Sequence, residues 1–224
     1  QKQRDASMQG LEFPFPYRPG QRDLVSGVYR TILRRKELFV QAPTGIGKTM
    51  STVFPAVRAL GEGHGDKIFY LTAKTITRTV AQEAFAILQE KGLKIKAVTL
   101  TAKEKMCACE EMACNPQACP RAKGHFDRVN AAVFEMLTEG KDYSREALMA
   151  QAEKWQVCPH EMQLDGASWT DAVICDYNYV FDPNVRLKRF FGEGCKGDYL
   201  FLIDEAHNLV DRGREMFSAA LWKE

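Results

Sequence analysis

The stretch that decides the fold is Ala42-Pro43-Thr44-Gly45-Ile46-Gly47-Lys48-Thr49. Its glycines let backbone N–H groups approach a phosphate closely, and a helix beginning at Lys48 would add partial positive charge there. An apolar run at 38–41 precedes the stretch and predicts the strand that a phosphate-binding loop follows. We therefore expect these eight residues to bind ATP, and a glycine-rich turn formed by chance is the less favoured interpretation.

Two residues of this loop have specific expected roles. The ammonium group of Lys48 should reach the β- and γ-phosphates, and the hydroxyl of Thr49 should coordinate Mg²⁺. Ala42 stands where many phosphate-binding loops have their first glycine. This departure from the general pattern restricts the loop to a narrower class of nucleotide-binding proteins.

Outward from the loop, strand and helix patterns alternate. Apolar runs predict strands at 67–71, 96–100, 172–175 and 199–203. Helical periodicity predicts helices at 18–36, 48–60 and 76–88. Such alternation is typical of an α/β domain with a parallel sheet and helices on both faces.

The alternation stops between residues 107 and 164, where cysteines cluster and two helices are predicted, at 126–137 and 144–155. We interpret this region as an insertion into the sheet domain. The predicted organisation is a first part of the sheet domain at 1–101, a mostly helical inserted domain at 102–165 and a second part of the sheet domain at 166–224.

Composition limits the classes of function. The chain has 224 residues and a formal net charge of only +2, so any contact with nucleic acid needs a local patch of charge. It lacks an apolar run long enough to span a membrane, and residues 1–9 are polar, unlike a signal peptide. Seven cysteines without a secretory signal indicate a reducing, intracellular (cytoplasmic) setting.

An acidic pair, Asp204 and Glu205, follows the predicted strand at 199–203. A carboxylate at the carboxyl end of a parallel strand lies near the phosphate-binding loop in such folds. Asp204 is therefore expected to hold Mg²⁺, and Glu205 to act as general base toward the water that attacks the γ-phosphate. His207 is expected to sense the state of the nucleotide. By itself the pair would indicate only a helix N-cap.

Five cysteines lie close together in the insertion: Cys107, Cys109, Cys114, Cys119 and Cys158. Zinc ribbons use Cys-x-x-Cys pairs, and none occurs here. Irregular spacing suits four thiolates that converge on an iron–sulfur cubane, but spacing favours iron–sulfur only slightly over zinc. For the two other cysteines, Cys175 and Cys195, burial in the core is the preferred interpretation.

Several of these motifs carry a family resemblance. The Asp204-Glu205-Ala206-His207 box after an Ala-x-x-Gly-x-Gly-Lys-Thr loop resembles the superfamily 2 motors. The segments that resemble the XPD/DinG helicases are Lys105-Met106-Cys107, Cys119-Pro120, Cys158-Pro159-His160-Glu161 and residues 172–183. The resemblance extends over residues 16–209, with the motifs in the order of the family.

The resemblance implies a RecA-like parallel-sheet domain of a P-loop NTPase with an inserted [4Fe-4S] domain. It implies cluster ligation by Cys107, Cys114, Cys119 and Cys158, with Cys109 as the alternative to Cys107. It also implies that Gln21 reads the adenine base and that residues 15–18 form a wall beside it.

Residues 70–78 resemble the segment that grips single-stranded DNA in these motors. The expected DNA contacts are Thr72, Lys74, Thr75 and Arg78, although a capped helix N-terminus is the alternative. A second contact near a DNA fork is expected from Arg121, Lys123 and Arg128.

The function expected from these features is that of an ATP-dependent DNA helicase, monomeric and moving 5′ to 3′ by resemblance. The chain ends soon after the acidic box, so the second RecA-like domain and the arch domain of the family are expected outside it, and the chain alone should hydrolyse ATP weakly or not at all. Two alternatives stay open: a zinc-stabilised, non-enzymatic DNA-binding module, and an ATP-driven protein–DNA remodeller that does not unwind.

Overall fold

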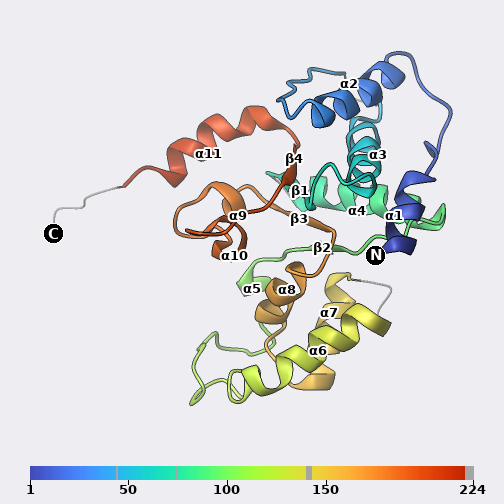
Figure 1. The fold of residues 1–224 in the computed structure, drawn as a ribbon. Coiled ribbons are helices and arrows are strands. Elements are labelled where there is room, and N and C mark those ends of the chain that lie inside the picture. The colour runs from blue at the N-terminus through green and yellow to red at the C-terminus, as the bar shows by residue number, and fades with distance from the viewer. Residues whose placement is uncertain (44, 74, 140–142, 220–224) are drawn as a thin grey trace. The chain divides into compact units, whose positions relative to one another are not determined.

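The structure is a computed structural model that describes residues 1–43, 45–73, 75–139 and 143–219. The chain divides into two compact units, one made of Gln1–Ile95 with Ile174–Glu224 and the other of Lys96–Val173 (Figure 1). The predicted insertion at 102–165 falls inside the second unit. The predicted domain limits themselves stay predictions.

Four strands form the sheet. They are β1 (Lys67–Thr72), β2 (Ala97–Thr99), β3 (Ala172–Asp176) and β4 (Tyr199–Ile203), in the order β2-β3-β1-β4. β1 and β4 run parallel, with Lys67 opposite Tyr199 and Leu71 opposite Ile203. Every residue of β1 is buried, as expected for a strand covered on both faces. The predicted α/β fold with a parallel sheet is confirmed.

The first unit also contains helices. They are α1 (Lys2–Gln9), α2 (Gln21–Leu33), α3 (Lys48–Gly61), α4 (Thr75–Glu90), α9 (Asn178–Phe181), α10 (Lys188–Phe191) and α11 (Leu209–Met216). α3 packs on β1 and β4, α4 packs on β1, and α1 and α2 pack on α3 (Figure 1). α3 is the central helix of this unit, because most of its residues are buried.

An aromatic cluster anchors β1 within the first unit. The ring of Phe69 lies 5.2 Å, centroid to centroid, from the rings of Phe190, Phe191 and Tyr199, and 5.7 Å from that of Phe201. Aromatic pairs at such distances stabilise a core beyond their buried area. This cluster joins α10 and β4 to β1.

The strand predicted at 38–41 is wrong. The segment belongs to no strand, and the side chain of Phe39 is 88% exposed, with Leu38 and Val40 each 45% exposed. An apolar run of this composition indicates a fit to a pleated, buried surface. The sequence does not show whether a neighbouring strand is present to provide that surface, and β4 ends the sheet on its own side.

The second unit is mainly helical. It contains α5 (Lys103–Met106), α6 (His125–Glu139), α7 (Arg145–Trp155) and α8 (Pro159–Ala167), and α6, α7 and α8 pack against one another. The hydroxyl of Ser144 caps α7 by accepting a hydrogen bond from the backbone N–H of Ala147 at 3.3 Å. Pro159 occupies the first turn of α8, where its missing N–H costs nothing.

Two arginines of the second unit bind carbonyls at the end of α7. Arg128 donates to the carbonyls of Trp155 at 3.1 Å and Gln156 at 2.7 Å. Arg121 donates to the carbonyl of Ala152 at 3.0 Å and pairs with the carboxylate of Glu153. The last carbonyls of a helix lack partners within the helix and carry partial negative charge, so cations bind favourably at a helix C-terminus. Both guanidinium groups, expected from the sequence at a DNA fork, therefore make contacts within the protein.

None of the helices in the described parts of the chain combines the length and the apolar character needed to cross a bilayer.

Candidate functional site

The phosphate-binding loop leads into the N-terminus of α3. Gly45 and Gly47 have left-handed backbones, at φ +84° and +81°, which favour glycine. A Cβ on Gly47 would lie 2.6 Å from the side-chain amide nitrogen of Gln21, so a side chain here requires that amide to move. The Nζ of Lys48 donates to the carbonyl of Ala42 at 3.1 Å, and its ammonium thus lies against its own loop. Thr44 lies outside the described residues.

Gln21, at the start of α2, holds this loop from the side. Its Nε2 donates to the carbonyl of Ile46 at 2.9 Å, and its Oε1 accepts from the backbone N–H of Arg18 at 3.0 Å. The side chain is buried, and the guanidinium of Arg18 donates to the carbonyl of Gly45. Both amide atoms of Gln21 thus have partners in the protein, and its expected contact with adenine stays a prediction.

The aromatic residues before α2 form a partly exposed surface. Tyr17 stacks on Phe13, with ring centroids 4.4 Å apart and planes 13° apart, and Phe13 meets Phe54 of α3 edge-on. Phe15 is also partly exposed. The expected role of residues 15–18 beside a base stays a prediction.

Tyr70 brings the two expected magnesium ligands together. Thr49 and Asp204 both lie close enough to its hydroxyl to affect the pKa of Tyr70, which burial and next the charge of Asp204 raise. Asp204 follows β4, and its backbone N–H donates to the carbonyl of Leu71 at 3.0 Å. Burial, and next the charge of Glu205, raises the pKa of Asp204, while nearby Lys48 lowers it. Thr49, Lys48 and Asp204 therefore share one site.

Glu205 has an uncommon backbone conformation for a residue with a side chain, at φ +51°. Its carbonyl accepts three hydrogen bonds, from the backbone N–H and Nδ2 of Asn208, both at 2.9 Å, and from the hydroxyl of Tyr177 at 3.1 Å. These contacts hold a strained residue in place, as is common at functional sites. The Nδ1 of His207 lies 3.5 Å from the carboxylate of Glu205, and both side chains are exposed.

Sequence reasoning assigned no role to the residues that follow β3. Tyr177 is fully buried, and its hydroxyl contacts the carbonyls of both Asp204 and Glu205. Arg212 of α11 donates to Asp176 at 3.0 Å and to Asn178 at 2.9 Å. The signal was present in the sequence, because polar residues directly after a buried parallel strand lie at the ligand-binding edge of such sheets.

The residues expected to bind DNA lie in different environments. Thr72 is completely buried, and among the described residues its hydroxyl has no hydrogen-bond partner. Arg78 of α4 lies 3.7 Å from the carboxylate of Asp176. Lys74 lies outside the described residues, and Thr75 begins α4 without a described side chain. Binding of DNA by these residues stays a prediction.

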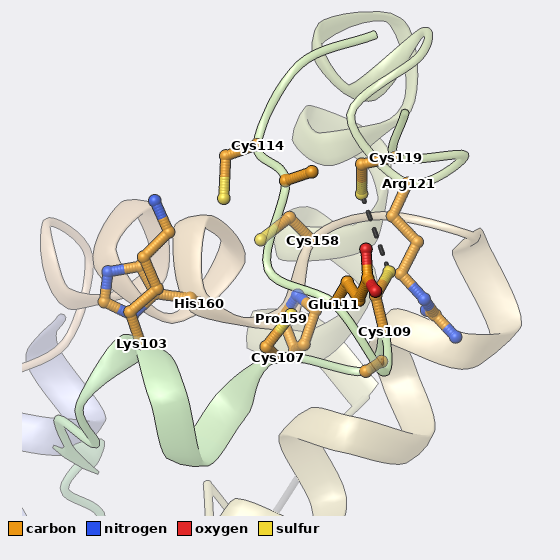
Figure 2. Close-up of a pocket in the computed structure, with 12 residues that line it drawn as sticks. Lys103, Cys107, Cys109, Glu111, Cys114, Cys119, Arg121, Cys158, Pro159 and His160 are labelled. Atoms are coloured by element: carbon orange, nitrogen blue, oxygen red, sulfur yellow. Dashed lines mark hydrogen bonds between the residues drawn. The ribbon is translucent and has the colours of Figure 1, made fainter. Parts of the chain in front are cut away.

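The five clustered cysteines line one small hollow of the second unit. Lys103, Arg121 and His160 line it with them, and Figure 2 shows the sulfur atoms of Cys114 and Cys158 turned toward one another. The Sγ atoms of Cys109 and Cys119 are 3.7 Å apart. Among the residues that the structure describes, no three cysteine, histidine or acidic side chains converge as the ligands of a single metal ion do.

The surroundings of these thiols differ. Burial raises the pKa of Cys158, and a hydrogen bond with Cys119 raises that of Cys109. The pKa of Cys119 is lowered, since hydrogen bonds from the backbone of Ala122 and Arg121 outweigh its burial. A hydrogen bond with Cys114 raises the pKa of Lys103.

The two cysteines outside this hollow lie in different environments. Cys175 is buried in β3, as expected, and burial raises its pKa. Cys195 is exposed, so its predicted burial is wrong; it follows a loop glycine, Gly194, rather than a strand.

Comparisons with known proteins show to which family the chain belongs. The DEAD_2 family model matches residues 72–224. The regulator of telomere elongation helicase 1 homolog of Caenorhabditis elegans is 22% identical over 89% of this chain and 24% of its own length. The XPD helicase subunit of general transcription and DNA repair factor IIH from Dictyostelium discoideum is 22% identical over 88% of this chain and 29% of its own length.

A solved XPD helicase structure has the same fold, with a TM-score of 0.60 and 20% identity over 90% of this chain and 34% of that one. The chain spans 24% to 34% of the length of these proteins. Because the family model covers more than half of the chain, this protein belongs to the DEAD_2 family and is an XPD/DinG-like member of the superfamily 2 helicases.

Proposed function

We propose that this chain binds ATP with Mg²⁺ and forms the nucleotide-hydrolysing part of a DNA helicase. The observation that carries the proposal is that Thr49 and Asp204 both lie near the hydroxyl of Tyr70, with Lys48 close enough to affect Asp204. A hydroxyl and a carboxylate are the protein ligands that Mg²⁺ takes together with nucleotide phosphates. The relatives named above are helicases, which supports the same class of motor.

In the proposed reaction, Lys48 exchanges the carbonyl of Ala42 for the β- and γ-phosphates. Thr49 and Asp204 would hold Mg²⁺, which would neutralise negative charge on the phosphates when bound. The Glu205 carboxylate accepts a proton from water as the water oxygen bonds to the γ-phosphorus and the bond to the β–γ bridging oxygen breaks. The hydrogen bonds on the carbonyl of Glu205 fix the backbone from which this carboxylate extends.

The proposed motor moves along single-stranded DNA in the 5′ to 3′ direction and separates duplexes at forks. ATP would close this domain against a second RecA-like domain, and hydrolysis would reopen it. The segment after β1 is the proposed DNA contact, where Arg78 would exchange the carboxylate of Asp176 for a DNA phosphate. The family resemblance supports the direction and the monomeric state.

We further propose that Cys107, Cys114, Cys119 and Cys158 hold a [4Fe-4S] cluster. All four line the same hollow, and thiolates are the ligands of such clusters. When bound, the cluster supplies iron–thiolate bonds that tie the loop after α5 to the start of α8.

Nucleotide binding tests the proposal through Lys48→Ala. Loss of a charged hydrogen-bond donor to phosphate, at about 1.5–3 kcal/mol, should weaken Mg-ATP binding by roughly ten- to a hundredfold. Isothermal titration of the chain with Mg-ATP measures this change. The matched control is Lys36→Ala, which removes an exposed lysine of the same unit and should bind like the unchanged chain. Equal affinity in both variants would contradict the proposed site.

Strand separation by the full-length protein tests the helicase part. The substrates are duplexes with a single-stranded tail at either the 5′ or the 3′ end. With ATP and Mg²⁺, we expect strand separation only of the duplex with the 5′ tail. If DNA stimulated ATP hydrolysis but neither duplex were separated, the helicase proposal would be wrong and the ATP-driven protein–DNA remodeller would be favoured.

A further inference from the structure

Cys109 is a fifth thiol in a hollow whose proposed cluster needs four. Its Sγ lies 3.7 Å from the Sγ of Cys119, and the dashed line in Figure 2 marks this contact. We propose that Cys109 and Cys119 form an intramolecular disulfide when the hollow holds no cluster. The pair would then be an oxidation site that competes with cluster assembly, and this second part rests on the ligand set proposed above.

The geometry needs only a small local movement. A disulfide brings two sulfur atoms to about 2.05 Å, so this contact must close by roughly 1.7 Å. Cys109 lies after the end of α5, and neither cysteine belongs to a helix or strand. Such segments move at low energetic cost compared with the helices they join. Both cysteines are partly exposed, so that a small reagent can reach them.

Cys107 is the main competitor for Cys109, because its thiol lies near enough to raise the pKa of Cys109. These residues are only two positions apart, and a disulfide between them would close a small ring far from the preferred geometry. Cys119 is ten residues from Cys109, which gives the chain enough length to satisfy that geometry. Cys119 is therefore the favoured partner.

The chemistry is thiol–disulfide exchange with a small-molecule disulfide as the oxidant. One cysteine, as a thiolate, attacks the reagent and forms a mixed disulfide while the first small-molecule thiol leaves. The second cysteine then displaces the other small-molecule thiol. Two protein thiols become one disulfide, and one reagent disulfide becomes two thiols that carry the two protons.

The consequence concerns Cys119, which belongs to both proposed states. Iron is bound by the thiolate form of cysteine, and a sulfur atom in a disulfide is not a thiolate. Oxidation of the pair should therefore block cluster assembly until a reductant restores both thiols. Cys109 would decide how readily the chain enters this blocked state.

Peptide mapping tests the disulfide directly. Cluster-free chain, prepared by iron chelation under reducing conditions, is treated with glutathione disulfide, and remaining thiols are alkylated. Cleavage at Lys, Arg and Glu separates residues 106–110, which carry Cys107 and Cys109, from residues 112–121, which carry Cys114 and Cys119. We expect the two peptides linked through Cys109 and Cys119, as assigned by fragmentation. Linkage of Cys107 to Cys109, any other pairing, or no linkage would overturn the proposal.

Two variants sharpen this test. Cys109→Ser should lose the linked peptides, and Cys195→Ser, which removes the exposed cysteine outside the hollow, should keep them. Uptake of iron and sulfide gives a second measurement. Oxidised chain should take up neither until it is reduced, whereas Cys109→Ser exposed to the same oxidant should take up both; equal uptake by the two would overturn the competition. Failure of uptake by every reduced chain would instead refute the cluster, while the linked peptides would still establish the disulfide.

Discussion

At the scale of single residues, backbone conformation and side-chain contact converge on the nucleotide site. Gly47 is left-handed and has the Gln21 amide where a side chain would be. Glu205 is left-handed although it has a side chain, and three hydrogen-bond donors hold its carbonyl. The left-handed backbone is therefore unstrained in the loop, where the residue is glycine. It is strained in the acidic box, at Glu205, the residue proposed as general base.

Gly47→Ala tests the need for glycine in the loop. The substitution should cost about 1–2 kcal/mol from its left-handed backbone, and it should also displace the Gln21 amide, which weakens nucleotide binding. The control is Gly63→Ala, at φ +83° with nothing within 4 Å of the added Cβ. It should show a similar loss of stability in urea with unchanged binding of Mg-ATP. If the Gly47 variant bound Mg-ATP normally, the Gln21 amide would not be needed for nucleotide binding by the loop.

Tyr177→Phe tests the support of the acidic box. The variant leaves the carbonyl of Asp204 without this hydroxyl donor, at a cost of about 0.5–1.5 kcal/mol. We expect the Mg²⁺ concentration that half-saturates nucleotide binding to rise roughly two- to tenfold. Tyr199→Phe, at the opposite end of β4, should leave it unchanged. A change in overall stability without a change in Mg²⁺ dependence would limit Tyr177 to a structural role.

At the scale of elements, the end of α7 explains how the second unit uses its cations. Arg121 and Arg128 come from the segment before α6 and from α6 itself, and both reach carbonyls near the C-terminus of α7. Their charges therefore stabilise a helix end, where carbonyl groups lack partners within the helix. This arrangement reduces the positive charge that the unit can offer to DNA.

Arg128→Ala should destabilise the second unit. Charged hydrogen bonds to three carbonyls, those of Lys123, Trp155 and Gln156, are lost, and we expect a cost of about 2–3 kcal/mol in urea denaturation. Lys123→Ala is the matched control, since it removes a nearby exposed positive charge and should change stability little. If Arg128→Ala kept full stability but lost binding to forked DNA, the contact with DNA expected from the sequence would be correct instead.

At the scale of the whole molecule, the chain combines a sheet unit that carries the nucleotide site with a helical unit that carries the cysteines. Few elements hold the cysteine loop in place, because residues 107–124 contain no helix or strand. A bound cluster would supply the missing cross-links. The stability of the second unit should therefore depend on the metal it holds.

Metal analysis checks this dependence. Chain purified without oxygen should contain about four irons with matching sulfide and absorb visible light as a cubane does. Removal of the iron by a chelator should increase hydrogen exchange of residues 107–124 and of the start of α8, while β1 and β4 stay protected. Stoichiometric zinc in a colourless chain would refute the cluster but leave the nucleotide site intact.

The sequence determined the class of fold and the order of its functional segments. Local features carry this information: hydrophobic periodicity gave β4 and α7 to within a residue, and Gly45, Gly47 and Lys48 form a loop whose role depends on backbone freedom and charge. The acidic pair could be assigned because a residue directly after a parallel strand lies at a known edge of the sheet. These inferences need only neighbours in the chain.

The tertiary structure decided what depends on neighbours far apart in the sequence. It left residues 38–41 outside the sheet and brought the hydroxyls of Tyr70 and Tyr177 to the acidic box. It also directed Arg128 to a helix end and placed Cys109 against Cys119. A sequence states which groups are available, but the partner of a cation, a hydroxyl or a thiol is set by packing, because these side chains bind whichever acceptor the fold places within reach.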